Sequence, residues 1–213
     1  MQSQPKTSLW MAGAFSAAIC LAGAMLVTFG TGLEGISAAL AATARLGFMF
    51  FLPAYAGSSM VALFGPAFLP LKRYGRELGL AFISVLTVHL SLVTWLCLIG
   101  EAPGRSTFIL FGIGVICAYA IALLSLGGLR KAMGPGVWWL VRVLGMNYIL
   151  YAFAIDFLNS PLHGSAWHIA LYLPFASLAL VAPVLRIAAA IRRADHLLRH
   201  SPYRPNDRRK VTS

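Results

Sequence analysis

The sequence predicts an all-α polytopic membrane protein, a bundle of six transmembrane helices with both termini in the cytoplasm. Of its 213 residues, 59% are hydrophobic and only 11% are charged, whereas about a quarter of an ordinary soluble domain is charged. The few charges gather in short runs between long apolar stretches. This composition excludes a soluble enzyme, a disordered chain, a disulfide scaffold and a secreted β domain.

Six apolar segments reach the length of about 20 residues that a membrane-spanning helix needs. Gly-rich and Pro-rich segments separate them, as expected for turns. The first segment is longer than the apolar core of a signal peptide, so we interpret it as a retained helix. The predicted spans are residues 8–30, 45–68, 78–98, 107–129, 137–159 and 167–190.

Three further features concern how these helices pack. Residues 35–43, before the second span, predict either a short helix on the membrane surface or an ordinary loop. Pro53, Pro174 and Pro183 lie inside spans and predict bends. Small residues recur every fourth position in two spans, which favours close helix contacts, although they are also typical of Ala-rich filler. They are Ala14, Ala18 and Ala22 in the first span and Gly114, Ala118 and Ala122 in the fourth.

The distribution of Lys and Arg fixes the predicted orientation. With six spans both termini lie on one side, and that side collects thirteen of the 17 positive residues: Lys6, Lys72, Arg73, Arg76, Arg130, Lys131, Arg192, Arg193, Arg199, Arg204, Arg208, Arg209 and Lys210. The other side holds Arg105, with Arg45 at its edge. Because positive loops stay in the cytoplasm, we expect an inner-membrane protein with a transmembrane domain over residues 1–190 and a basic cytoplasmic tail over 191–213.

The net charge of +11 does not indicate a nucleic-acid partner, because seven of the 17 positive residues lie in this tail. A basic cytoplasmic tail is typical of membrane topology and lipid contact. The lipid bilayer is therefore the predicted partner.

Ionisable residues inside spans are costly and mostly face the bundle interior. Arg186 and Arg142 are near enough to a helix end to extend to the interface, although for Arg142 an interior position is equally compatible with the sequence. Asp156 lies at a similar outer depth to Arg45, which favours an ion pair between them. A proton-relay carboxylate or a contact to a bound cofactor is the alternative for Asp156.

His89 lies about 15 Å along the third span from Gly79, near the bilayer midplane. A single histidine there either hydrogen-bonds to a neighbouring helix or ligates a metal or haem. Its surroundings, Arg73-Tyr74-Gly75-Arg76-Glu77-Leu78-Gly79-Leu80 followed by Val88-His89-Leu90, resemble the ferric reductase-like transmembrane domain family. The likeness is nearest to the haem-binding membrane subunits of periplasmic methionine sulfoxide reductase systems. Segments 43–47 and 131–139 are similar to weaker motifs of that family, and the resemblance covers roughly residues 40–160.

The resemblance implies a haem b with His89 as an axial ligand and Arg45 as a contact to a haem propionate. The only metal it implies is the haem iron. Family members place the partner histidines on helix five, but residues 137–159 contain no histidine. Arg142 and either Ile155 or Asp156 occupy the corresponding positions. Met146, about ten residues into that span, is the alternative second ligand, and the usual interpretation of such a Met is core packing.

The other histidines, His163, His168, His196 and His200, lie at the outer edge or in the tail. Three functions follow as expectations. The first is a haem b electron-transfer subunit with a degenerate ligand set, and hence a membrane oxidoreductase subunit. The second is an accessory or assembly subunit of a membrane complex that has lost haem. The third is a small transporter with Arg45, Asp156 and Arg142 as polar relays. The tail has no GxGxxG turn for flavin or nicotinamide, so the electron donor would be a quinone or a separate redox subunit.

Overall fold

The computed structural model describes residues 4–126, 134–159 and 166–199, and these residues form helices without any strand. Within these described residues, six helices are long and apolar enough to cross a membrane, which confirms the predicted all-α class and the six apolar spans. They are α1 (Gln4–Phe29), α2 (Leu33–Phe64), α4 (Gly75–Leu98), α5 (Arg105–Leu126), α7 (Gly134–Asn159) and α8 (Ala166–Arg199). A 3-10 turn, η1 (Pro66–Phe68), and the five-residue α3 (Leu69–Arg73) connect α2 to α4.

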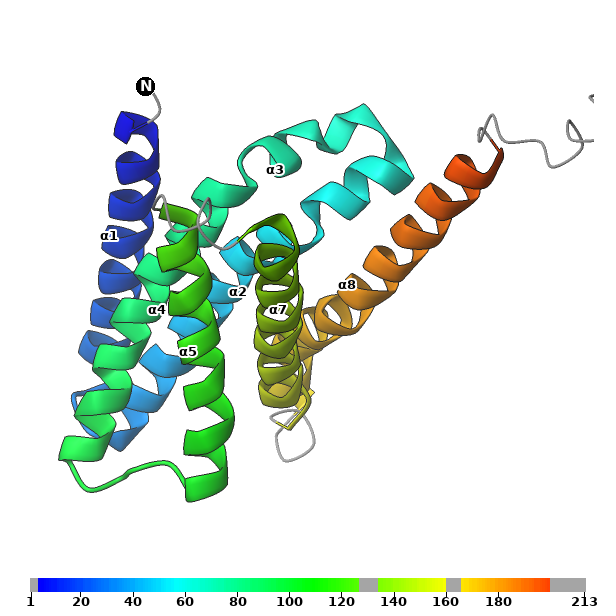
Figure 1. The fold of residues 1–213 in the computed structure, drawn as a ribbon. Helices are drawn as coiled ribbons and strands as arrows, with labels where there is room; N and C mark the ends of the chain where they lie inside the picture. Colours follow the sequence, from blue (N-terminus) through cyan, green and yellow to red (C-terminus); the bar gives the residue numbers. More distant parts are fainter. Residues whose placement is uncertain (1–3, 127–133, 160–165, 200–213) are drawn as a thin grey trace, which may run out of the picture.

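Helix α2 is the centre of the bundle (Figure 1). It packs against α1, α4 and α8, while α7 packs against α5 and α8. Helices α4 and α5 contact each other much less than these pairs do. The start of α1, the helix α3 and the end of α8 lie at one end of the bundle, which we call the α3 end. The α1–α2 turn and the α4–α5 loop lie at the opposite end, which we call the loop end.

The second helix begins twelve residues earlier than the sequence predicts. Residues 35–43 form neither a separate surface helix nor a loop, because α2 is continuous from Leu33 to Phe64. The turn before it is very short: Gly30 adopts a φ of +85°, and a Cβ on Gly35 would collide with the carbonyl oxygen of Gly30. Arg45 is consequently about 18 Å along α2 rather than at its outer start.

The predicted small-residue faces are buried. Ala14, Ala18 and Ala22 of α1 pack with Val85 and Val88 of α4. Ala118 and Ala122 of α5 are also buried, and a Cβ on Gly114 would make ordinary contact with Ala152 and Tyr148 of α7. Such residues let helix backbones approach closely, since little side-chain volume separates them.

The larger core is aromatic and lies where α2, α4, α7 and α8 meet. Phe48 and Phe157 are fully buried, with ring centroids 5.1 Å apart and an edge-to-face geometry. The ring of Phe153 stacks on that of Phe157. This core covers one side of α2. The polar side chains of the candidate site lie on other sides of the same helix.

Helix α8 continues to Arg199, past the predicted domain boundary at residue 190, and runs through Pro174 and Pro183 without a break. Helix α2 likewise runs through Pro53. The rest of the predicted tail, residues 200–213, lies outside the described residues.

Candidate functional site

The site centres on His89 of α4 and Thr43 of α2. The Thr43 side chain is fully buried, and its Oγ1 lies 2.9 Å from Nδ1 of His89. The same hydroxyl lies 2.8 Å from the carbonyl oxygen of Ala39 and 3.1 Å from that of Leu40. A threonine inside a helix often donates a hydrogen bond to the carbonyl four residues earlier. Here the bond to Ala39 holds the Thr43 hydroxyl beside the His89 imidazole.

The direction of the Thr43–His89 bond depends on the tautomer of His89. When the Thr43 hydroxyl donates its one proton to the carbonyl oxygen of Ala39, its oxygen accepts a hydrogen bond from Nδ1–H. The carbonyl of Leu40 also interacts with the ring. In the neutral imidazole, the lone pair is then on Nε2. This tautomer can bind a metal or accept a proton through Nε2.

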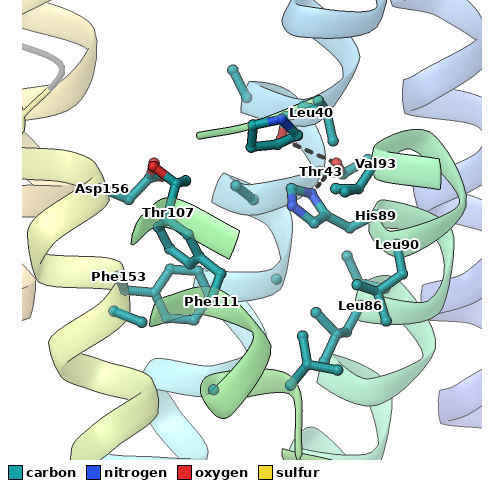
Figure 2. A pocket seen from close by; sticks show the side chains of 18 of the residues that line it. Leu40, Thr43, Leu86, His89, Leu90, Val93, Thr107, Phe111, Phe153 and Asp156 are labelled. Atoms are coloured by element: carbon teal, nitrogen blue, oxygen red, sulfur yellow. Dashed lines mark hydrogen bonds between the residues drawn. The ribbon is translucent and has the colours of Figure 1, made fainter. Parts of the chain in front are cut away.

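His89 lines a cavity of about 560 Å³ in the loop-end half of the bundle. This volume lies within the range of about 300–1,000 Å³ that is typical of small-molecule sites. Apolar side chains from several helices form most of its wall, including Leu86 and Val93 of α4, Phe111 of α5 and Phe153 of α7. Figure 2 shows the hydrogen-bonded His89 and Thr43 at one side of this space.

Asp156 of α7 lies across the cavity from His89 (Figure 2). The other α7 residues on that wall are Ile149, Ala152 and Phe153, none of which ligates iron. Met146 does not line the cavity; it is partly buried and packs against the aromatic core. The structure therefore brings His89 and Asp156 to one cavity and places Met146 elsewhere, so the role of Met146 as second ligand stays a prediction.

Arg45 faces a different side of α2. Its guanidinium carbon lies 4.3 Å from the ring centre of Tyr172 of α8, and its Nε is buried without a hydrogen-bond partner. Arg45 interacts electrostatically with Asp156, but no ion pair within 4.0 Å joins these two residues. Arg45 does not line the cavity that holds His89, and its contact with a haem propionate stays a prediction.

A second polar group connects α2, α7 and α8 nearer the α3 end. The Tyr55 hydroxyl donates to Oδ1 of Asn147 at 2.6 Å, and the guanidinium carbon of Arg186 lies 4.4 Å from the Tyr55 ring centre. Arg186, which we expected to extend to the interface as an anchor, is thus partly buried against a neighbouring helix. Arg142 lies exposed on α7.

The structure describes only the backbone of two of the remaining histidines and neither backbone nor side chain of the other two. His168 and His196 lie on α8, with side chains outside the description, and His163 and His200 lie outside the described residues. Among the described residues, no three His, Cys, Asp or Glu side chains gather into a metal-binding group.

Thr43 is the site residue that sequence reasoning missed. In the sequence it belongs to the weak motif at residues 43–47 and lies outside the predicted second span, residues 45–68. Counting from the observed ends, Thr43 is ten residues from the start of α2 and His89 is nine from the end of α4. Two antiparallel neighbours with these counts place the two side chains at the same depth, and this was the available signal.

No protein-family model matches the chain, and no curated protein or solved structure shows significant similarity to it. The resemblance to the ferric reductase-like family therefore stays a prediction. It depends on the motif around His89 and on segments 43–47 and 131–139.

Proposed function

We propose that this chain is a membrane electron-transfer subunit that binds one haem b through His89. The observation that carries the proposal is the hydrogen bond of 2.9 Å between Nδ1 of His89 and the buried Thr43 hydroxyl. A histidine that ligates a metal almost always donates its other ring N–H to such an acceptor, which fixes the ring and its tautomer. The result is a lone pair on Nε2 beside an apolar cavity of about 560 Å³.

The side chains present fit a haem with one protein ligand. When bound, the haem supplies a site that takes up and releases one electron. The chain's own contribution is to hold the iron through His89, to exclude water with Phe111 and Phe153, and to keep a single carboxyl group, Asp156, on the opposite wall. The family's second histidine has no counterpart on that wall, which distinguishes this site from the family pattern.

The proposal includes an orientation. We place the protein in the inner membrane with both termini in the cytoplasm, because the positive residues concentrate on that side. The loop end, and with it the cavity, then belongs to the periplasmic half of the bundle. A quinone or a separate redox subunit supplies the electrons.

The visible spectrum of the protein purified in mild detergent tests this function. We expect a Soret band in the oxidised protein that shifts on reduction with dithionite and is lost in His89→Ala. The matched control replaces His163, His168, His196 and His200 together and keeps the band.

A Soret band of full intensity in His89→Ala would refute the ligand assignment. Absence of the band in the wild-type protein, after expression with haem supplied, would refute haem binding. It would favour the non-enzymatic accessory subunit, in which the Thr43–His89 bond only holds α2 against α4.

A further inference from the structure

A second hollow lies on the outside of α2, between α1 and α8. It has a volume of about 750 Å³ and is lined by side chains of α1, α2 and α8. We call it the Arg45 groove, because Arg45 is the one charged side chain among the described residues that line it. Helices α1 and α8 both pack against α2 here, so the groove runs along α2 and faces the surroundings of the bundle.

The guanidinium of Arg45 lacks a hydrogen-bond partner at one of its nitrogens. Its Nε is buried without a hydrogen-bond acceptor, and burying such a donor is costly unless it is paired. The Tyr172 ring, 4.3 Å from the guanidinium carbon, stabilises the positive charge but accepts no ordinary hydrogen bond in the guanidinium plane. An anionic oxygen beside the guanidinium would compensate its positive charge, and the planar guanidinium of an arginine suits phosphate especially well.

The side chains on either side of Arg45 differ in a way that suits an amphiphile. Toward the loop end, the α2 wall of the groove consists of residues with little side-chain volume, Ser37, Ala38, Ala41 and Ala42, and the facing α1 wall holds Met25 and Phe29. Beyond Arg45, toward the α3 end, Leu46 and Met49 of α2 make the wall apolar. A polar group can therefore reach Arg45 from the loop end, with an alkyl chain continuing along the apolar part.

Asp156 of α7 is an anion that could compete for Arg45. It interacts with Arg45 electrostatically, but it lines the His89 cavity and forms no direct ion pair with Arg45. No acidic side chain belongs to the described lining of the groove itself. The guanidinium donors thus remain available to a ligand in the groove.

We propose that the Arg45 groove binds one anionic phospholipid, with its phosphate on the Arg45 guanidinium and an acyl chain along Leu46 and Met49. The positive charge supplies the preference for an anionic headgroup, and the apolar wall accepts the chain. The groove shares Ser37, Ala41 and Tyr172 with the wall of the His89 cavity, but Arg45 lines only the groove and His89 lines only the cavity. The proposed lipid contacts do not include His89 and do not depend on haem.

Native mass spectrometry of the purified chain tests the site. The protein in detergent is mixed with equal amounts of phosphatidylglycerol and phosphatidylcholine, and the ratio of the two bound lipids is measured. Because Arg45 carries a positive charge among apolar side chains, we expect the wild-type protein to bind more phosphatidylglycerol than phosphatidylcholine, with a ratio clearly above one. Arg45→Gln should bring the ratio close to one.

Two further variants separate the groove from general electrostatics. Ala42→Leu fills the groove while Arg45 is retained, and it should reduce phosphatidylglycerol binding. Arg105→Gln removes an exposed positive charge at the same end of the bundle but outside the groove, and it should keep the wild-type ratio. Arg45→Lys, which keeps the charge, should retain part of the preference and serves if Arg45→Gln does not fold.

An unchanged lipid ratio in Arg45→Gln, an unchanged ratio in Ala42→Leu, or an equal loss in Arg105→Gln would each overturn the proposal. The readout is lipid mass rather than the haem spectrum. Failure here therefore leaves the proposed electron-transfer function untouched, and failure of haem binding leaves this site untouched.

Discussion

Thr43 and His89 lie at the same depth on two antiparallel helices, and a single hydrogen bond of 2.9 Å joins Oγ1 of one to Nδ1 of the other. Because Oγ1 also bonds to the α2 backbone, the imidazole is tied to the main chain of its neighbour through one hydroxyl. The orientation of His89 therefore depends on Thr43.

Replacing Thr43 by Val tests this dependence with little change in shape. Thr43→Val leaves Nδ1–H of His89 without its acceptor, and such a loss typically costs about 1–3 kcal/mol. We expect a lower melting temperature in detergent and, where haem is bound, weaker haem retention by about 10–100-fold. Thr43→Ser keeps the hydroxyl and should behave nearly as the wild-type protein does. Equal stability and haem content in the Val and Ser variants would show that the hydroxyl does not position His89.

Replacing Gly35, at the turn between α1 and α2, should lower the stability of the protein. A Cβ on Gly35 would collide with the carbonyl oxygen of Gly30, a backbone atom with no room to move aside. Gly35→Ala should therefore destabilise the protein or shift the start of α2, with a loss of more than about 1 kcal/mol. Gly13 offers a control inside α1, because a Cβ there meets nothing within 4 Å. Gly13→Ala should be neutral or stabilising by about 0.5–1 kcal/mol, and thermal unfolding followed by circular dichroism compares the two.

The sequence was sufficient for the class of fold because hydropathy depends on composition alone. Six apolar segments separated by Gly and Pro predict six helices whatever their contacts are. It was insufficient for the start of α2. Residues 35–43 are Ala-rich, and alanine favours a helix, but nothing in the sequence shows that this helix continues into the second span. The packing fixes that continuity, since Gly35 lies against Gly30 and Ala39 is fully buried beside α1 and α4.

That one error changed the interpretation of the site. A second span that starts at Arg45 places this residue at the outer edge and leaves Thr43 outside the span. The face of α2 that Arg45 occupies, next to the face that lines the His89 cavity, depends on which helices surround α2. Pairwise contacts of this kind, including the Arg–Tyr packing of α2 on α8, are set by three-dimensional arrangement and leave no periodic signal in a single sequence.

Tyr55 makes two separable interactions, a hydrogen bond to Asn147 and a cation–π contact with Arg186. Tyr55→Phe keeps the ring and removes the hydroxyl, so we expect a loss of about 0.5–1.5 kcal/mol. Tyr55→Leu removes both interactions and should lose a further 0.5–2 kcal/mol or so. Thermal unfolding of both variants measures the difference. Equal melting temperatures for the Phe and Leu variants would mean that Arg186 gains nothing from the ring.

The orientation is tested by fusing reporters after residue 213. Thirteen positive residues group with the termini against two on the other side, so the fused end should be cytoplasmic. A reporter that is active only in the cytoplasm should be active, and one that needs the periplasm should be silent. The reverse pattern would overturn both the orientation and the assignment of the cavity to the periplasmic half.

Arg45 and Asp156 interact electrostatically without a direct ion pair, and a double-mutant cycle measures how strongly they are coupled. Asp156→Asn removes a carboxylate that interacts with a partly buried guanidinium, so we expect a lower melting temperature in detergent. Adding Arg45→Gln should recover part of that loss, because the uncompensated charge is then gone. Without direct contact, the coupling should lie at the lower end of the range of about 0.5–3 kcal/mol found for interacting residues. Strict additivity of the two variants would show that they act independently.

The same cycle connects the pair with the lipid in the Arg45 groove. A bound phosphate would compensate Arg45 in place of Asp156. The destabilisation by Asp156→Asn should then be smaller in micelles that contain phosphatidylglycerol than in micelles that contain phosphatidylcholine. This difference should vanish in the Arg45→Gln background, where neither anion has a partner. A lipid effect that persists in that background would place the anionic lipid away from Arg45.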